Sequence, residues 1–242
     1  MTFTFNPAHM ADDLDSFSKG AAKFLQKGSK SRIDQLRIDL VSAVASAKKG
    51  GGQDFVWRTR RDNPILFSGS QSWKGGTDDF DTMTAEISID YLCSLQVETG
   101  RVWVKGAVVI TFRDSGNGGV KVVHFDTEEG GWREVVEGRT VERAAHPPFH
   151  SQFHGAMNDI PRLPSLIVHP IDVLNFAVME LHQKHWRKHI DTAKAKTLLR
   201  HLPKRQRERL RAILHQWDAT VGLTYTHALI AMQRPFPKPL EL

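Results

Sequence analysis

The sequence predicts an α+β protein, in which an antiparallel β-meander of about four or five strands lies between an N-terminal helical hairpin and a C-terminal helical part. Apolar and polar residues alternate across residues 83–97, with Leu92 as the one exception, and this period of two is typical of a strand with one buried face. On both sides of the strands, apolar residues recur at the helical period instead. Because helices and strands occupy separate runs, the pattern favours α+β over a repeated βαβ unit.

The order of these runs predicts one domain that spans residues 1–242. Its expected parts are N-terminal helices over 1–50, the antiparallel sheet over 51–155, C-terminal helices over 169–232 and an extended, proline-rich tail over 233–242. A chain of 242 residues, 40% of them hydrophobic, is long enough to bury a substantial core without disulfide bonds.

Two helices are expected before the sheet. The first should begin at Asn6 and Pro7, where asparagine can cap the helix and proline fits its first position, and should end at Gly28. The second should begin near Ser31, which forms a variant capping box with Asp34, and should end at Gly50. Its apolar stripe consists of Ile33, Leu36, Leu40, Val44 and Ala47. We expect the two helices to form a hairpin that covers part of the sheet.

The sheet is expected to be centred on a long hairpin with a two-residue loop at Thr99 and Gly100. In that register Tyr91 pairs with Val108 and Ile89 with Ile110, so every pair on one face is apolar, and a slip of one residue would destroy this match. The expected strands are 54–60, 83–97, 101–113 and 120–125, and 65–67 and 132–136 are further candidates.

Helical periodicity returns at Pro170, which suits the first position of a helix. A helical pair should follow over 192–201 and 203–217, and a last helix over 224–232. The apolar residues expected in the core are Ile171, Leu174, Val178, Leu181, Trp186, Leu198, Leu202, Leu210, Ile213, Leu214 and Trp217.

The composition indicates a basic protein of the cytoplasm, with a formal net charge of +6 and a pI of about 9.5. No secretory signal is visible at the N-terminus, and no run approaches the ~18 apolar residues of a membrane span. The single cysteine, Cys93, falls on the apolar face of its strand, which indicates a buried thiol rather than a nucleophile.

The positive charge is concentrated in residues 184–211, which contain eleven Lys and Arg residues against Asp191 and Glu208. Periodic leucines should hold these helices on the core and leave the basic side chains facing outward together. Such a surface attracts polyanions, so we expect binding of DNA or RNA without sequence preference. The same residues would equally suit an adaptor that binds an acidic protein partner. The expected contact residues are Lys184, Arg187, Lys188, Lys204, Arg205, Arg207 and Arg211.

Histidines provide a second candidate site. If Phe149–His154 is a strand, His150 and His154 share one face, with Cα atoms ~13 Å apart, which is too far to hold one metal between them unaided. Histidine suits proton transfer near neutral pH, so His150 and His154 are candidate catalytic residues of a hydrolase or nuclease. His182, His185 and His189 line one side of a helix. That side is expected either to face solvent or to contact phosphates, with Trp186 stacked on a base.

Familiar cofactor and metal motifs are not found in the sequence. It contains no GxxxxGK[ST], no GxGxxG before a helix, no GxSxG, no HExxH and no CxxC, so it indicates no particular cofactor and no metal site. Of the three hypotheses, nucleic-acid association ranks first, the adaptor second and the hydrolase third.

Overall fold

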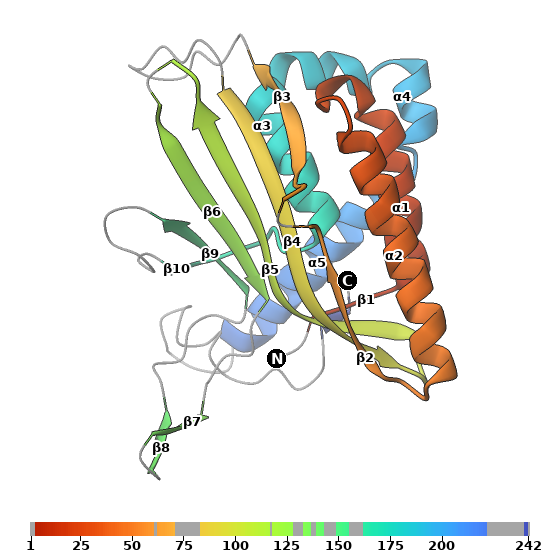
Figure 1. The fold of residues 1–242 in the computed structure, drawn as a ribbon, viewed down its shortest axis with the longest axis vertical. Coiled ribbons are helices and arrows are strands. Elements are labelled where there is room, and N and C mark those ends of the chain that lie inside the picture. The colour runs from red at the N-terminus through yellow and green to blue at the C-terminus, as the bar shows by residue number, and fades with distance from the viewer. Residues whose placement is uncertain are drawn as a thin grey trace.

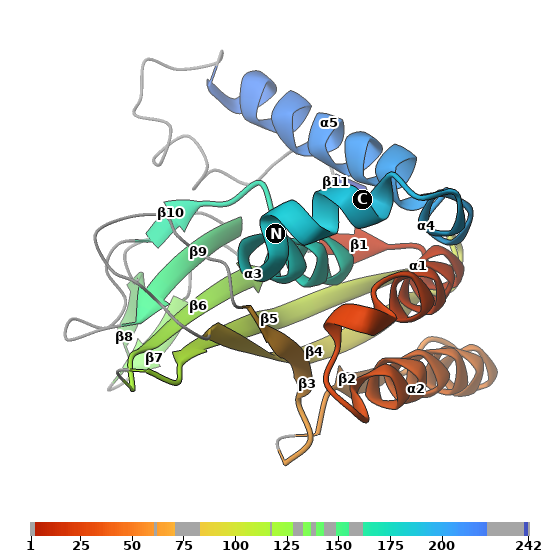
Figure 2. The same cartoon turned by 90° about the horizontal axis from the view of Figure 1, so that it is seen from above.

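The computed structural model describes residues 3–60, 62–70, 83–116, 118–127, 133–136, 139–142, 149–154, 162–221 and 240–241. It has the expected α+β architecture, a strongly curved sheet with helices packed on one face (Figures 1 and 2). The helices are α1 (Pro7–Gly20), α2 (Ser29–Lys49), α3 (Pro170–Ile190), α4 (Ala193–Leu198) and α5 (Leu202–Val221), with a 3-10 turn at Ala22–Phe24. The strands are β1 (Phe3–Phe5), β2 (Asp54–Arg58), β3 (Ile65–Ser70), β4 (Met83–Gln96), β5 (Arg101–Asp114), β6 (Val120–Thr127), β7 (Arg133–Val136), β8 (Arg139–Glu142), β9 (Phe149–His154), β10 (Arg162–Pro164) and β11 (Leu240–Glu241).

The long strands β4 and β5 form the centre of the main sheet. On the edge of β4 that faces away from β5, β2 and β3 pair with successive parts of the strand. On the edge of β5 that faces away from β4, β1 and β6 pair with successive parts of the strand. The sheet then continues from β6 through β9 to β10, and all of these pairs are antiparallel. β11 pairs with β1 in parallel, while β7 and β8 form a separate two-stranded ribbon. The strand expected over 132–136 is therefore present as β7 but lies outside the main sheet.

The central hairpin is present, but the predicted register was wrong by two residues. Ile89 pairs with Val108 and Tyr91 with Gly106, because the loop has four residues, 97–100, rather than two. Gly100 closes this loop by donating its N–H to the Gln96 carbonyl at 2.8 Å. A slip of two residues leaves every side chain on its original face, so the apolar alternation is compatible with both registers.

A glycine fits the observed register. Gly106 has φ +139°, in the region that side-chain-bearing residues rarely adopt, and it lies opposite Tyr91. A Cβ atom at this position would lie 2.1 Å from the Asp90 carbonyl oxygen. The close approach of the two backbones therefore requires glycine at position 106.

The core lies between the sheet and helices α1, α2 and α3. On the sheet side, Ile87, Ile89 and Tyr91 are at most 1% exposed. On the helix side, the whole stripe predicted for α2 is buried, as expected. Trp57 of β2 joins the two layers, because its indole N–H donates to the Leu36 carbonyl of α2 at 2.9 Å. The expectation that these helices cover the apolar face of the hairpin is confirmed.

The N-terminal helices differ from the prediction at their junction. Asn6 caps α1 as expected, accepting from the N–H groups of Ala8 and His9, but α1 ends at Gly20 rather than Gly28. The chain leaves the helix because it joins β3, where the Gln26 N–H donates to the Leu66 carbonyl at 2.9 Å. The capping box predicted at Ser31 and Asp34 is absent, since α2 begins at Ser29.

The C-terminal helices follow the predicted order, and α5 lies over α3 as an outer layer (Figure 2). α3 begins at Pro170 and is kinked at His182, whose ring nitrogen lies 3.0 Å from the Ser68 carbonyl oxygen of β3. Leu214 was predicted in the core but is 50% exposed. The helix expected over 224–232 lies outside the described residues, as do most of the tail and the Trp217 side chain.

Candidate functional site

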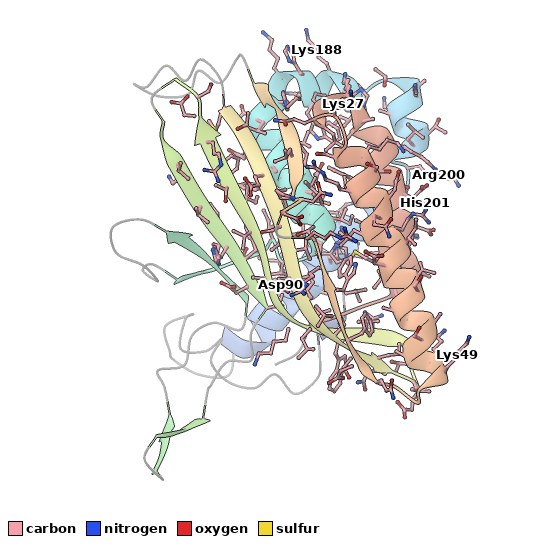
Figure 3. The ribbon with its side chains drawn as sticks, in the orientation of Figure 1. Lys27, Lys49, Asp90, Lys188, Arg200 and His201 are labelled. Atoms are coloured by element: carbon pink, nitrogen blue, oxygen red, sulfur yellow. The ribbon has the colours of Figure 1, made fainter. Side chains whose placement is uncertain are left out.

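The basic segment predicted from the sequence covers three successive helices, and most of its charges face outward. Six of the seven expected contact residues are exposed, namely Lys184, Arg187, Lys188, Lys204, Arg207 and Arg211. Figure 3 labels Lys188 at the end of α3 and Arg200 beside the junction of α4 and α5. Lys194 and Lys196 of α4 are also exposed, so this surface is continuous in sequence from α3 to α5. We call these exposed Lys and Arg residues of 184–211 the basic surface.

Helix α5 divides its basic residues between two stripes. Lys204, Arg207 and Arg211 are spaced three and four residues apart, and they form an exposed stripe. Arg205 and Arg209 lie on the opposite side, in line with the buried Ile213. The inward stripe of this helix is therefore partly made of arginine.

The two inward arginines form an ion-pair network with carboxylates of α1 and α3. Arg209 donates to both Asp172 oxygens, from Nε at 2.7 Å and from a terminal nitrogen at 2.5 Å, and its other terminal nitrogen lies 3.6 Å from Asp13. Arg205 pairs with Asp13 and, at 3.5 Å, with Asp12. The Asp13, Arg209 and Asp172 side chains are only 2–7% exposed. We call Asp13, Asp172, Arg205 and Arg209 the buried charge network.

Burial shifts the pKa values of one member of this network, Asp13, and of its neighbour His169. Desolvation raises the pKa of Asp13, although Arg205, which is hydrogen-bonded to it, and Arg209 act in the opposite direction. Burial also lowers the pKa of His169 well below 6.5, and the positive charges of Arg209 and Arg205 lower it further. His169 therefore stays neutral near pH 7, where its Nδ1 accepts from the Ile171 N–H at 3.3 Å and caps α3.

The network changes the expected role of one residue. Arg205, predicted to contact nucleic acid, has a side chain that is 17% exposed and already engaged with α1. It also donates to the His9 carbonyl at 3.1 Å. Its contribution to any external ligand is therefore small beside its contribution to the position of α5. Asp13, Asp172 and Arg209 were not predicted to form a site. The signal in the sequence was the spacing of Arg205, Arg209 and Ile213 at i, i+4 and i+8.

Trp186 and two histidines of α3 pack against Phe24 and do not form an outward-facing side of the helix. Trp186 is 5% exposed and contacts the Phe24 ring edge-on, with centroids 5.3 Å apart, so the expectation that it stacks on a base was wrong. His182 and His189 also pack on Phe24, and His189 lies 2.7 Å from the Gly20 carbonyl oxygen. Burial lowers the pKa of His182. Only His185 of the three predicted histidines is exposed.

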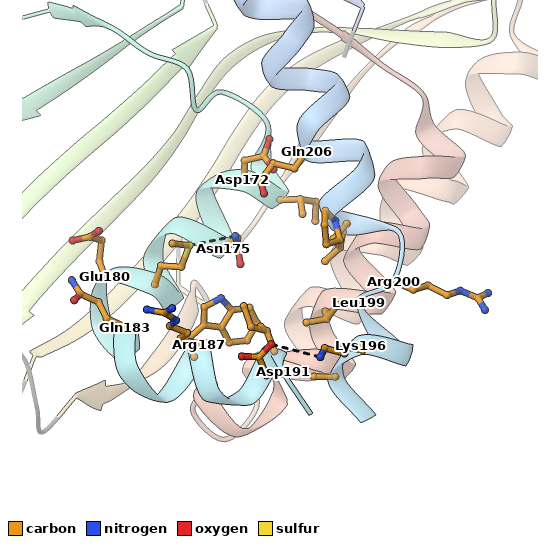
Figure 4. A pocket seen from close by; sticks show the side chains of 17 residues that line it. Asp172, Asn175, Glu180, Gln183, Arg187, Asp191, Lys196, Leu199, Arg200 and Gln206 are labelled. Atoms are coloured by element: carbon orange, nitrogen blue, oxygen red, sulfur yellow. Dashed lines mark hydrogen bonds and ion pairs between the residues drawn. The ribbon is translucent and has the colours of Figure 1, made fainter. Parts of the chain in front are cut away.

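A groove of about 890 Å³ runs between α3 and the α4–α5 segment (Figure 4). Most of its exposed lining surface is apolar and comes from Trp186 together with Ile171, Met179, Ile190, Ala195, Leu199, Leu202 and Pro203. Asn175, Gln183 and Gln206 supply amides along its length. Lys196 forms an exposed ion pair with Asp191 at 3.6 Å, while Arg200 points away from the hollow in Figure 4.

The histidine candidates lie on a confirmed strand. By register, His150 is opposite Asp126 of β6 and His154 is opposite Val122. The His150 and His154 side chains lie outside the described part of the structure, so their catalytic role stays a prediction. His146 also lies outside the described residues. Within the described residues, no group of three or more His, Cys, Asp or Glu side chains could hold a metal ion.

Cys93 matches the prediction for a core thiol. It is fully buried, and burial raises its pKa to about 12. The thiolate form is therefore scarce at neutral pH, and the thiol is inert toward ordinary reagents.

Comparison with protein-family models, with curated proteins and with solved structures gives no match. None of the helices in the described residues is both long and apolar enough to cross a membrane.

Proposed function

We propose that the protein associates with nucleic acid and contacts its phosphates through the basic surface, without reading base sequence. The observation that supports this proposal is the division of charge on α5. Two arginines neutralise buried carboxylates, and the remaining Lys and Arg residues face solvent on the same rigid helix. Charges that do not hold the fold together are free to meet a ligand.

Among the described residues, few carboxylates form ion pairs with the Lys and Arg residues of this surface. Lys196 pairs with Asp191 at 3.6 Å and Lys204 with Glu208 at 3.9 Å, and all four side chains are at least 58% exposed. Exposed pairs of this kind contribute at most about 1 kcal/mol and are readily exchanged for other partners. A phosphate can therefore compete with either carboxylate for its cation.

Nucleic acid suits the surface better than an acidic polypeptide because of its charge density. Duplex DNA carries one negative charge per ~1.7 Å of axis, whereas an extended poly-glutamate chain carries one per ~3.3–3.6 Å. Each neutralised phosphate releases condensed counterions, with a slope of about −0.9 in log K against log salt. Six exposed side chains acting together would give a slope of about −5. No helix or strand of the described residues carries a set of side chains that resembles a base-reading element, so the contacts belong to the backbone class.

Fluorescence anisotropy with labelled duplex and single-stranded DNA tests the proposal. Binding at micromolar protein is expected at about 50 mM salt, with a steep loss as salt rises and little difference between unrelated sequences. Labelled poly-L-glutamate serves as the matched acidic polypeptide. Absence of DNA binding would reject the proposal, and tighter binding of poly-glutamate than of DNA would favour the adaptor function in its place.

A further inference from the structure

We propose that the groove between α3 and α5 is a docking site for an amphipathic helix of a partner protein, whose apolar face is flanked by carboxylates. This proposal does not depend on nucleic-acid binding, because the partner's anchors would lie in the apolar hollow; the exposed cations around it enter only through their attraction for negative charge. The argument rests on the chemistry of the floor, the length of the wall and the charge of the surroundings.

The floor of the groove is suited to aliphatic side chains. Met179 and Ile190 remain 47% and 38% exposed along its walls, beside the nearly buried Trp186 and Leu199. Contiguous exposed apolar surface on a folded protein commonly marks an interaction site. Nucleobases would require an exposed aromatic ring to stack on, and Trp186, the one aromatic residue of the lining, is 5% exposed. The hollow therefore favours Leu, Ile or Met side chains over bases.

The wall formed by α3 has the length of a peptide helix. Its lining residues Ile171, Asn175, Met179, Gln183 and Arg187 are spaced by four. Because each step of four advances about 40° around the axis, they form a stripe that winds around α3 and passes the kink at His182. Measured along the helix, sixteen residues at 1.5 Å each span about 24 Å, which is roughly four to five helical turns. An elongated groove between two helices is the arrangement in which a third helix inserts anchors at i, i+4 and i+7.

The surroundings select an acidic partner. The charged residues of the lining are balanced, with Arg187, Lys196 and Arg200 against Asp172, Glu180 and Asp191. Asp172 is held by Arg209 and Asp191 pairs with Lys196, while Glu180 and Arg200 both point away from the hollow in Figure 4. The excess of positive charge comes from the surroundings, where residues 180–211 carry nine exposed Lys and Arg residues against Glu180, Asp191 and Glu208. Long-range attraction therefore favours a helix that carries Glu or Asp beside its apolar stripe, and it disfavours a basic one.

The native chain allows a site-specific test. Its single cysteine, Cys93, is buried, so Met179→Cys gives one reactive thiol in the groove. Ile38→Cys, on the outer face of α2 and equally exposed at 47%, gives the matched control. Each variant is labelled with an environment-sensitive fluorophore. The probe is a synthetic peptide of about 16 residues, which as a helix matches the wall at 1.5 Å per residue, with Leu at i, i+4, i+7 and i+11, Glu on both sides of this stripe and Ala elsewhere.

The acidic helix should shift the emission of the label at position 179 saturably and leave the label at position 38 unchanged. A peptide of the same composition with its leucines spread around the helix should not bind, and one with Lys in place of Glu should bind at least tenfold more weakly. Ile190→Asn should weaken binding at least tenfold while the circular dichroism spectrum stays unchanged. Because this substitution is uncharged, DNA binding should keep its affinity and salt slope, which separates the groove from the proposed function.

Several outcomes would overturn the proposal. If no saturable signal is seen at up to about 1 mM peptide, the groove does not bind such a helix. A dissociation constant above about 1 mM corresponds to a binding free energy weaker than ~4 kcal/mol. Equal binding of the Lys peptide removes the acidic partner. Saturation of the label by single-stranded DNA assigns the groove to nucleic acid. A label that is already shielded without peptide shows that another part of this chain or a second copy fills the groove.

Discussion

Helices α2 and α5 are docked on the protein by different chemistry. α2 lies on the sheet through an unbroken apolar stripe from Ile33 to Ala47, in which every predicted residue is buried. α5 lies over α1 and α3 through a stripe in which Arg205 and Arg209 occupy two of the inward positions. Both stripes follow the helical period, but the first stabilises by burying apolar surface and the second by neutralising buried charge.

The difference separates the charges of α5 that hold it on the protein from those that the proposed function uses. Because Asp13 and Asp172 are buried, the inward arginines are needed to neutralise them, since an uncompensated charge in the interior is costly. The outward residues Lys204, Arg207 and Arg211 make no comparable contact with the described residues beyond the long Lys204–Glu208 pair. Counting positive charges along the sequence therefore overestimates the number available to a ligand.

The largest effect is expected from Arg209→Met, which keeps much of the side-chain volume and removes the charge. Asp172 then loses both of its short hydrogen bonds, and Asp13 keeps only Arg205. Breaking a buried ion pair from one side costs about 3–5 kcal/mol of unfolding free energy. Urea denaturation measures the loss, and Arg211→Met on the exposed stripe, expected to change stability by less than about 0.5 kcal/mol, is the control. Equal stability of the two variants would contradict the assignment of Arg209.

A comparable but smaller loss is expected from Leu40→Ala in α2. Leu40 is fully buried, and truncation of a buried leucine costs about 2–5 kcal/mol through lost transfer energy and the remaining cavity. The exposed Val41, changed to Ala, provides the neighbouring control with little expected effect.

Measuring the same unfolding free energies at several salt concentrations distinguishes the two helices further. The cost of Arg209→Met should change with ionic strength less than that of an exposed pair, and the cost of Leu40→Ala should not fall as salt is raised.

Acid should weaken the protein through His169. Burial first, and then Arg209 and Arg205, hold its pKa well below 6.5, so the folded state binds its proton less readily than the unfolded chain. As pH falls below about 6.5, only the unfolded chain takes up this proton, and the unfolding free energy drops by up to about 1.4 kcal/mol per pH unit. His182, whose pKa is also lowered by burial, contributes in the same direction.

The variant His169→Asn isolates this contribution, because asparagine is a good N-cap and does not titrate. Denaturation at pH 7.5 and pH 5.5 should show a smaller loss for the variant than for the natural chain. An identical loss in both would show that His169 does not carry the effect.

The sequence predicts the apolar part of this structure well. In α2 and in β4, a regular period identifies the buried face, and burial is confirmed for the whole α2 stripe and for the β4 face from Ala85 to Leu95. At the two ends of the predicted strand, Met83 is half-buried and Val97 is 53% exposed in the loop. The register of β4 and β5 was not predictable from the same signal, because pairing Tyr91 with Val108 or with Gly106 places the same side chains on the same face. The loop length decides between the two registers, and no turn motif marks it.

The charged part was less accessible to prediction. Asp13 and Arg205 are 192 residues apart in the sequence, so no local pattern links them. The period of α5 nevertheless contains the information, because Arg209 lies four residues before Ile213 and on the same side. The exposed residues of the basic surface were predicted correctly as exposed, whereas Trp186 fitted both the apolar stripe and a stacking role, and packing against Phe24 decided for the former.

The most direct test of this account reverses the outward stripe of α5 alone. The triple variant Lys204→Glu, Arg207→Glu and Arg211→Glu is compared with Lys48→Glu, Lys49→Glu and Arg58→Glu, which changes the net charge equally; Figure 3 shows Lys49 far from Lys188 and Arg200. DNA binding is measured by anisotropy from about 50 to 200 mM salt, together with thermal stability. We expect the α5 variant to lose binding while it stays folded, and the control variant to keep most of its affinity and its salt slope. Undiminished binding by the α5 variant, or an equal loss in both, would contradict the claim that these outward charges form the ligand surface.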